Sequence, residues 1–187
     1  MSSPRFPAEL TDLIKTSKYV HVATCSNAAI PSIALMNYIY VPKKDSFRPN
    51  VDKRDYIIFA TSEDSEKYDN ILANPTIALL FHDWITANNL SIRKTDISTD
   101  SDTHVERLNN LLEELNQDEL NQISATIRGK AHILNSESKE STYYRHLLLK
   151  SNPDADIFIL GENTATIKVE ILSAKVTDSE NNKKSYL

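Results

Sequence analysis

Four polar residues between Thr61 and Lys67 could together hold a phosphate group. Thr61 follows the apolar run Tyr56–Ala60, which predicts a buried strand, and Ser62 starts a segment with helical features. A helix N-terminus favours an anion because its free amides and its dipole point toward it. The hydroxyls of Ser62 and Ser65 would add donors, and the ammonium of Lys67 would add a full charge. The spacing is therefore compatible with a phosphate cradle that is built without glycine.

The plainer alternative is purely structural. Ser62 suits an ordinary N-cap, Lys67 suits an ordinary surface position, and the residues taken alone favour this alternative. Three carboxylates, those of Glu63, Asp64 and Glu66, lie beside the candidate cradle and would repel a dianion. The cradle therefore requires that these three side chains point away while Lys67 points in.

Other ways of holding a phosphate or a metal ion can be excluded by composition. The chain has two glycines, Gly129 and Gly161, so neither a glycine-rich dinucleotide turn nor a P-loop can form. Its one cysteine, Cys25, can form neither an internal disulfide nor a cysteine-based zinc site, and we predict no metal site.

The bulk numbers favour one globular domain. The chain has 187 residues, of which 40% are hydrophobic and 25% charged, close to globular averages. The formal net charge of −5 argues against a nucleic-acid partner. We find neither a signal peptide nor the ~18 consecutive apolar residues of a membrane span, so we expect no membrane partner. We expect a cytoplasmic protein, with the nucleus as the alternative.

The hydrophobic pattern predicts strands that follow one another through short links, with helices between some of them. We expect helices over Pro7–Ser17, Ser62–Ala73, Thr103–Leu120 and Glu137–Lys150, and strands over Tyr19–Thr24, Pro31–Val41, Tyr56–Ala60, Thr76–Trp84, Ile123–Leu134, Asp156–Leu160 and Thr166–Val176. This order favours a mainly β fold, an antiparallel barrel with peripheral helices, over a doubly wound sheet. We expect a single domain over residues 1–187, with a helical and polar insertion around 85–120 and a polar tail from Asp178.

A series of short motifs runs through these predicted strands. The central ones are Thr61, Ser65-Glu66-Lys67, Asn70-Ile71, Asn74-Pro75 and Ile77–Phe81; Val22-Ala23-Thr24 and Ile30–Tyr38 precede them, and Ile127–Ala131 follows. Over roughly residues 8–84 and 122–176 the chain resembles the pyridoxamine-phosphate-oxidase-like family of FMN-binding split barrels, including its uncharacterised fungal members.

The resemblance implies a flavoprotein that works as a homodimer, with FMN in the cleft between the subunits. It implies that the phosphate is held by Thr61, Ser65 and Lys67, with Ser62 beside them, and that the ring and ribityl chain lie along Leu35, Met36 and Asn37. It also implies that His82, Asp83 and Trp84 can reach the site from the partner subunit; packing is an equal alternative for Trp84.

The chain departs from true pyridoxamine-phosphate oxidases at three places. Glu66 stands where those enzymes carry arginine, no arginine occurs between Ser32 and Met36, and no arginine follows Arg145 to form their Arg-x-His motif. Without these cations a phosphorylated vitamer has little to hold it. We therefore expect FMN binding without oxidase activity on pyridoxamine phosphate.

Three functions remain open from the sequence. The first is a flavin-dependent oxidoreductase that acts on a small substrate, with the flavin supplying the redox chemistry. The second is a non-enzymatic FMN binder, and the third is a split barrel that has lost its cofactor and serves as an interaction protein. Catalytic residues are not assigned.

Overall fold

A computed structural model of the chain describes residues 6–82, 123–178 and 181–187. The strands are β1 (Tyr19–Cys25), β2 (Pro31–Asn37), β3 (Ile39–Val41), β4 (Tyr56–Ser62), β5 (Thr76–His82), β6 (Ser124–Ile133), β7 (Thr164–Thr177) and β8 (Lys183–Tyr186). The helices are α1 (Ala8–Thr16), α2 (Glu66–Ala73), α5 (Lys139–Ser151) and α6 (Asp156–Ile159), with 3-10 turns η1 (Lys43–Asp45) and η4 (Pro153–Ala155). The insertion expected around 85–120, its helix at Thr103–Leu120, and Asp83 and Trp84 lie outside the described residues.

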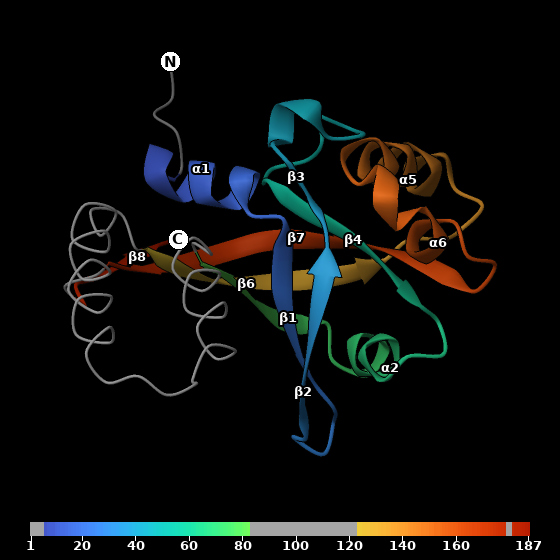
Figure 1. The fold of residues 1–187 in the computed structure, drawn as a ribbon, viewed down its shortest axis with the longest axis horizontal. Coiled ribbons are helices and arrows are strands. Elements are labelled where there is room, and N and C mark those ends of the chain that lie inside the picture. The colour runs from blue at the N-terminus through green and yellow to red at the C-terminus, as the bar shows by residue number, and fades with distance from the viewer. Residues whose placement is uncertain (1–5, 83–122, 179–180) are drawn as a thin grey trace, which may run out of the picture.

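The strands form one antiparallel sheet that closes through a bend. Its order is β2-β1-β5-β6-β7-β4-β3, with β8 added on the edge of β7. The two ends of this path, β2 and β3, are separated along the chain by Tyr38 alone, so one bent segment joins both ends of the sheet. The β1–β2 hairpin projects beyond the rest of the sheet, whereas α1, α5 and α6 lie toward the opposite end (Figure 1). The expectation of a mainly β split barrel with peripheral helices is confirmed.

The bend at Tyr38 is fixed from three sides. The Tyr38 phenol, whose pKa is raised by burial, donates to the Ile14 carbonyl at the end of α1. Its carbonyl accepts a hydrogen bond of 3.1 Å from Asn152 Nδ2, and its ring packs edge-on against Phe81 at 5.2 Å. These contacts explain why the segment predicted as one strand, Pro31–Val41, is divided into β2 and β3.

The core lies on both sides of β4. Alternate residues such as Ile57 and Phe59 point into the barrel, whereas Ile58 and Ala60 pack against the helices, so the strand is buried on both faces from Tyr56 to Thr61. Helix α5 covers the outer face of β4. The apolar run that predicted a buried strand is therefore confirmed.

Two predicted elements are wrong in type or extent. Helix α2 begins at Glu66 and not at Ser62, because β4 continues to Ser62 in a ladder with Thr164 and a turn then leads to the N-cap, Ser65. The segment Asp156–Leu160 is not a strand: α6 follows η4 there, and Ile157 and Phe158 are exposed.

The polar tail contains a strand that was not predicted. Strand β8 pairs with the end of β7, where Lys183 lies opposite Thr177. An edge strand satisfies backbone groups and needs no alternating apolar pattern. In the three described ranges, no helix combines the length and apolarity needed to cross a membrane.

Candidate functional site

A cleft opens where the ladder between β3 and β4 stops. Ile39 pairs with Ile58 and Val41 with Tyr56, but beyond Tyr38 the chain turns away to pair with β1. In the described chain no ladder joins β2 to β4, so Leu35–Asn37 and Ala60–Ser62 face each other across a gap. The cleft measures about 900 Å³, within the ~300–1,000 Å³ typical of small-molecule and cofactor sites.

The structure gathers the residues predicted for the cofactor around this cleft. Those that line it are Leu35, Met36, Asn37, Thr61, Ser62 and Lys67. Ser65 stands behind them: its hydroxyl lies 3.0 Å from Thr61 Oγ1 and donates to the Ser62 carbonyl at 2.7 Å. Three separate elements, β2, the end of β4 and the start of α2, thus contribute to one site.

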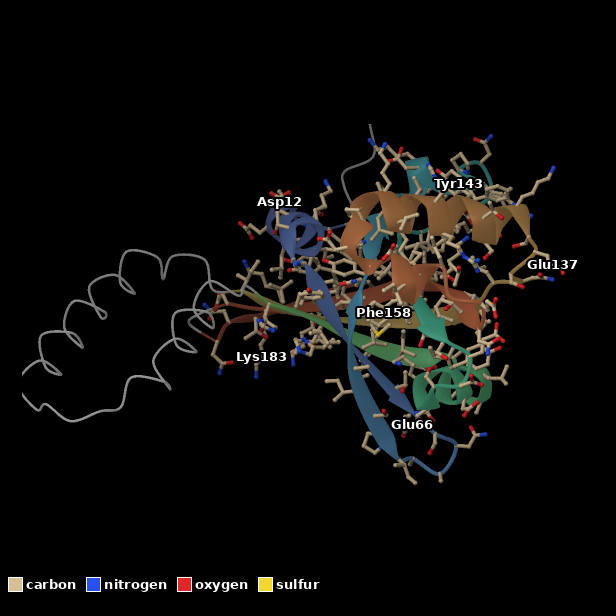
Figure 2. The ribbon with its side chains drawn as sticks, turned by 45° about the vertical axis from the view of Figure 1, so that its right-hand side comes forward. Asp12, Glu66, Glu137, Tyr143, Phe158 and Lys183 are labelled. Carbon is tan, nitrogen blue, oxygen red and sulfur yellow. The ribbon has the colours of Figure 1, made fainter. Side chains whose placement is uncertain are left out.

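None of the three carboxylates beside the predicted cradle lines the cleft. Glu66 Oε2 accepts a hydrogen bond of 3.2 Å from the Ser32 hydroxyl on β2, and Figure 2 shows Glu66 beside the β1–β2 hairpin. Glu63, Asp64 and Glu66 are all absent from the lining of the cleft, whereas Lys67 belongs to it.

No described residue forms an ion pair with Lys67. Its ammonium makes no hydrogen bond or ion pair with any described residue, and burial lowers its pKa although the neighbouring charge of Glu66 acts in the opposite direction. The N-cap of α2, Ser65, makes no capping hydrogen bond with its side chain. An anion at this helix start would therefore satisfy both the ammonium and the first amides.

The described lining of the cleft is positive although the chain is negative. The charged residues among the described lining are Lys15, Lys18, Lys67 and Asp154, in a protein with a formal net charge of −5. Lys15 lies in the last turn of α1 and Lys18 lies between α1 and β1. Neither was identified from the sequence, because nothing in their local pattern distinguishes them from surface lysines. Ile157 and Phe158 also line the cleft. They were not identified from the sequence because their segment was predicted to be a strand.

Other motif residues have structural roles. The Asn70 amide is buried and donates to Thr24 Oγ1 at 3.1 Å, which ties α2 to β1. A Cβ at Gly129 would lie 2.4 Å from Val169 Cγ1, at the point where the β6–β7 register shifts. Both residues shape the scaffold and neither lines the cleft.

The histidines and the cysteine form no metal-binding cluster in the described part of the chain. Within the described ranges, no three His, Cys, Asp or Glu side chains gather closely enough to hold a metal ion. His21 stacks on His82 with ring centroids 5.4 Å apart, and Cys25 is a half-buried free thiol.

Relatives in sequence share nearly the whole chain. The family model for pyridoxamine 5'-phosphate oxidase matches residues 6–160. A pyridoxamine 5'-phosphate oxidase homolog of Saccharomyces cerevisiae is 56% identical over 183 residues, covering 94% of this chain and 92% of the relative. Another homolog, from Schizosaccharomyces pombe, is 33% identical, covering 97% of this chain and 90% of the relative.

Solved structures share the fold at low sequence identity. A heme binding protein of Mycobacterium smegmatis matches with a TM-score of 0.60 at 12% identity; the match covers 96% of this chain but 58% of that protein. General Stress Protein 26 of Bacillus anthracis matches with a TM-score of 0.53 at 16% identity, covering 94% of this chain and 95% of that protein. The sheet and the cleft between its ends fit the fold of the family that the sequence matches. The chain belongs to the pyridoxamine 5'-phosphate oxidase-like family, with relatives in fungi.

Proposed function

We propose that the protein is an FMN-binding flavoprotein whose cleft holds the cofactor across the split of the barrel. The phosphate lies at Thr61, Ser62 and Lys67, with Ser65 behind them, and the ring and ribityl chain lie along Leu35, Met36 and Asn37. The observation that supports this best is the Lys67 ammonium, which pairs with no described residue and lies in a cleft that Glu63, Asp64 and Glu66 do not line.

The donor set fits this cofactor. Hydroxyls and an ammonium at one end suit a phosphate dianion. Leu35 and Met36 on one wall and Phe158 on another offer apolar surface to a flat ring. Bound flavin would supply the redox chemistry, while the residues of this chain bind it, orient it and limit access of water.

The proposed activity is that of an oxidoreductase on a small substrate other than pyridoxamine phosphate. Arginine is absent from the described residues that line the cleft, so a second phosphorylated ligand finds no planar cation there. A carrier of FMN without turnover is the alternative. Oxidation of NADH or NADPH by the FMN-loaded protein, with a panel of acceptors, distinguishes the two. The single free Cys25 suits work in the reducing cytoplasm or nucleus.

The cofactor site is proposed to be completed by a second copy of the chain. Large hydrophobic side chains are exposed at the cleft and on the segments that form it. Leu35, Ile157 and Phe158 line the cleft, and Ile30, Ile33 and Leu160 are exposed on the same two segments, the β1–β2 hairpin and the end of α6. Apolar side chains gathered around a ligand cleft are typical of a surface that another subunit covers. A homodimer with flavin between its subunits accounts for their exposure.

The test is titration of purified protein with FMN, followed by the visible absorbance of the flavin. Saturable binding with perturbed flavin bands is expected for the unmodified protein. Lys67→Ala should weaken binding about tenfold or more, because it removes one charge-assisted contact to the phosphate.

Lys44→Ala is the matched control, since Lys44 is an exposed lysine on η1 and its removal alters the net charge equally. Equal affinity of both variants would show that Lys67 does not contact the phosphate. If the unmodified protein binds no FMN, the flavoprotein proposal fails and the interaction protein becomes the better account.

A further inference from the structure

Arg145 lies on the face of α5 that packs against the ends of β4 and β7. Ser141, Arg145 and Leu148 are spaced by four and three residues, so they share one side of the helix. The Ser141 hydroxyl donates to Thr166 Oγ1 at 3.3 Å, and Leu148 is buried and lines the cleft. The side chain between them is thus directed at the same strand ends.

The contact made by Arg145 reaches the phosphate end of the cleft. Its Nη2 donates to the Thr164 carbonyl at 3.3 Å. Thr164 is the register partner of Ser62, and both residues line the cleft. The guanidinium therefore lies behind the strand pair that carries one of the proposed phosphate ligands.

The charge of Arg145 has no counterion among the described residues. Two other cations that contact the sheet are paired: Arg54 with Glu170 at 3.1 Å and Lys168 with Glu140 at 2.7 Å. Arg145 forms no ion pair with any described carboxylate, and its Nε is buried without an acceptor. A half-buried guanidinium without an anion is costly, and an anion bound near it would remove this cost.

We propose that Arg145 is the second cation of the phosphate site, acting from behind the Ser62–Thr164 pair. This inference rests on the proposed FMN site. Lys67 contacts the phosphate from α2, and Arg145 adds a second positive charge from α5. The second charge compensates for the negative charge of Glu66. Arg145 is a positioning residue: it holds the start of β7 through the Thr164 carbonyl and adds positive potential where the phosphate lies.

The experiment compares FMN with riboflavin, which lacks the phosphate, as ligands of Arg145→Met and Arg145→Lys. If the charge acts on the phosphate, Arg145→Met should weaken FMN binding about five- to tenfold and leave riboflavin binding within about twofold. Arg145→Lys keeps the charge and should retain most of the FMN affinity. Raising the salt concentration should reduce the difference between unmodified protein and Arg145→Met for FMN.

Arg48→Met is the matched control, because Arg48 is an exposed arginine in the loop before β4, outside the lining of the cleft, and its loss alters the net charge equally. Equal weakening of FMN and riboflavin in Arg145→Met would overturn the inference in favour of a structural role. Unaltered FMN affinity in both Arg145 variants would overturn it as well. If unmodified protein binds neither flavin, the proposed function itself fails, and that outcome is distinct from the other two.

Discussion

At the scale of single residues, the hydrogen bond between Glu66 and Ser32 decides how the phosphate end of the cleft is charged. Glu66 and Lys67 are neighbours in the first turn of α2, yet one side chain bonds to β2 and the other lines the cleft. Adjacent helical positions point in directions about 100° apart, so a carboxylate and a cation next to each other need not share a site. In the sequence, an acidic residue next to Lys67 argues against a phosphate site, but the helix geometry directs the two side chains to different places.

Removing the Glu66 charge should therefore tighten FMN binding. In Glu66→Gln the hydrogen bond to Ser32 can persist while the repulsion of a phosphate dianion by a carboxylate near Lys67 is lost. We expect an affinity two- to fivefold higher, about 0.4–1 kcal/mol, measured by flavin fluorescence titration. Glu9→Gln on α1 removes the same charge away from the cleft and should leave the affinity unaltered. Unaltered or weaker binding by Glu66→Gln would contradict the proposed place of the phosphate.

Some residues around the cleft could be predicted from their neighbours in the sequence, and others could not. Thr61, Ser62 and Lys67 could be predicted because a strand, a turn and a helix start follow one another within a few positions. Lys15 and Phe158 could not, because they reach the cleft only once distant segments fold against the same strands. Arg145 gave no signal either, since its relation to Thr164 exists only across the α5–β7 contact.

At the scale of elements, a cluster around Lys168 fastens α5 and the loop before β4 to the sheet. The Lys168 ammonium lies 2.7 Å from Glu140 Oε1 and 3.4 Å from Asp52 Oδ1, and 4.0 Å from the centre of the Tyr56 ring. Lys168 is 8% exposed, so breaking either pair leaves a charge with little water around it.

The titration of this cluster sets two limits on stability. Burial alone would raise the pKa of Asp52, but its hydrogen bonds and the charge of Lys168 outweigh burial and lower it. The stability that this provides is present above the unfolded-state pKa of about 3.9 and is lost as pH falls through the folded-state value. Burial alone would lower the pKa of Lys168, but the hydrogen bond and charge of Glu140 raise it. That contribution is present below about pH 10.4 and is lost as pH rises through the folded-state pKa.

Asp52→Asn should lower the free energy of unfolding by about 1–3 kcal/mol at pH 7, between the values typical of exposed and buried pairs. The loss should shrink as pH falls below about 3.9, because the lowered pKa of Asp52 then contributes less stability to the unmodified protein. Urea unfolding at pH 7 and at acidic pH measures both quantities. Glu137→Gln removes an exposed carboxylate just before α5 and should have little effect. An equal loss at both pH values would show that the charge of Asp52 is not what stabilises the contact.

The elements differ in how far their own sequence determines them. β4 and α1 were predicted because a continuous apolar run and an apolar stripe at helical spacing are local properties. The run Asp156–Leu160 is short enough to suit either a strand or a helix, and the preceding turn at Pro153 with the packing of Ile159 selects the helix. Strand β8 forms because the edge of β7 offers backbone partners, which no property of its own sequence indicates.

At the scale of the whole molecule, one face of the sheet is uncovered by any described element. Along β2, β1 and β5 the residue pairs Leu35–His21 and His21–Leu80 place two exposed leucines in one row, and Ile33 lies next to them at 66% exposure. This face is continuous with the cleft, because Leu35 belongs to both. It is the surface on which we expect the second subunit to pack.

Ile33→Asp should therefore convert a dimer into a monomer, because a carboxylate buried between two subunits would lack a partner. Light scattering coupled to size-exclusion chromatography measures the mass directly. Val51→Asp is a close control, since Val51 is 67% exposed but lies in the loop before β4, away from the cleft. A dimer that withstands Ile33→Asp as well as Val51→Asp would place the interface elsewhere.

The split at Tyr38 also links ligand binding to folding. Beyond this residue the two ends of the sheet lack the backbone ladder that joins β3 to β4, so the barrel is left open along that seam. A molecule bound to both β2 and β4 would provide contacts between these strands in place of the missing backbone hydrogen bonds. Since such a molecule binds the folded chain and not the unfolded one, each tenfold excess over its dissociation constant adds about 1.4 kcal/mol to the stability of the barrel. The same opening that makes room for a ligand thus makes that ligand a part of the fold.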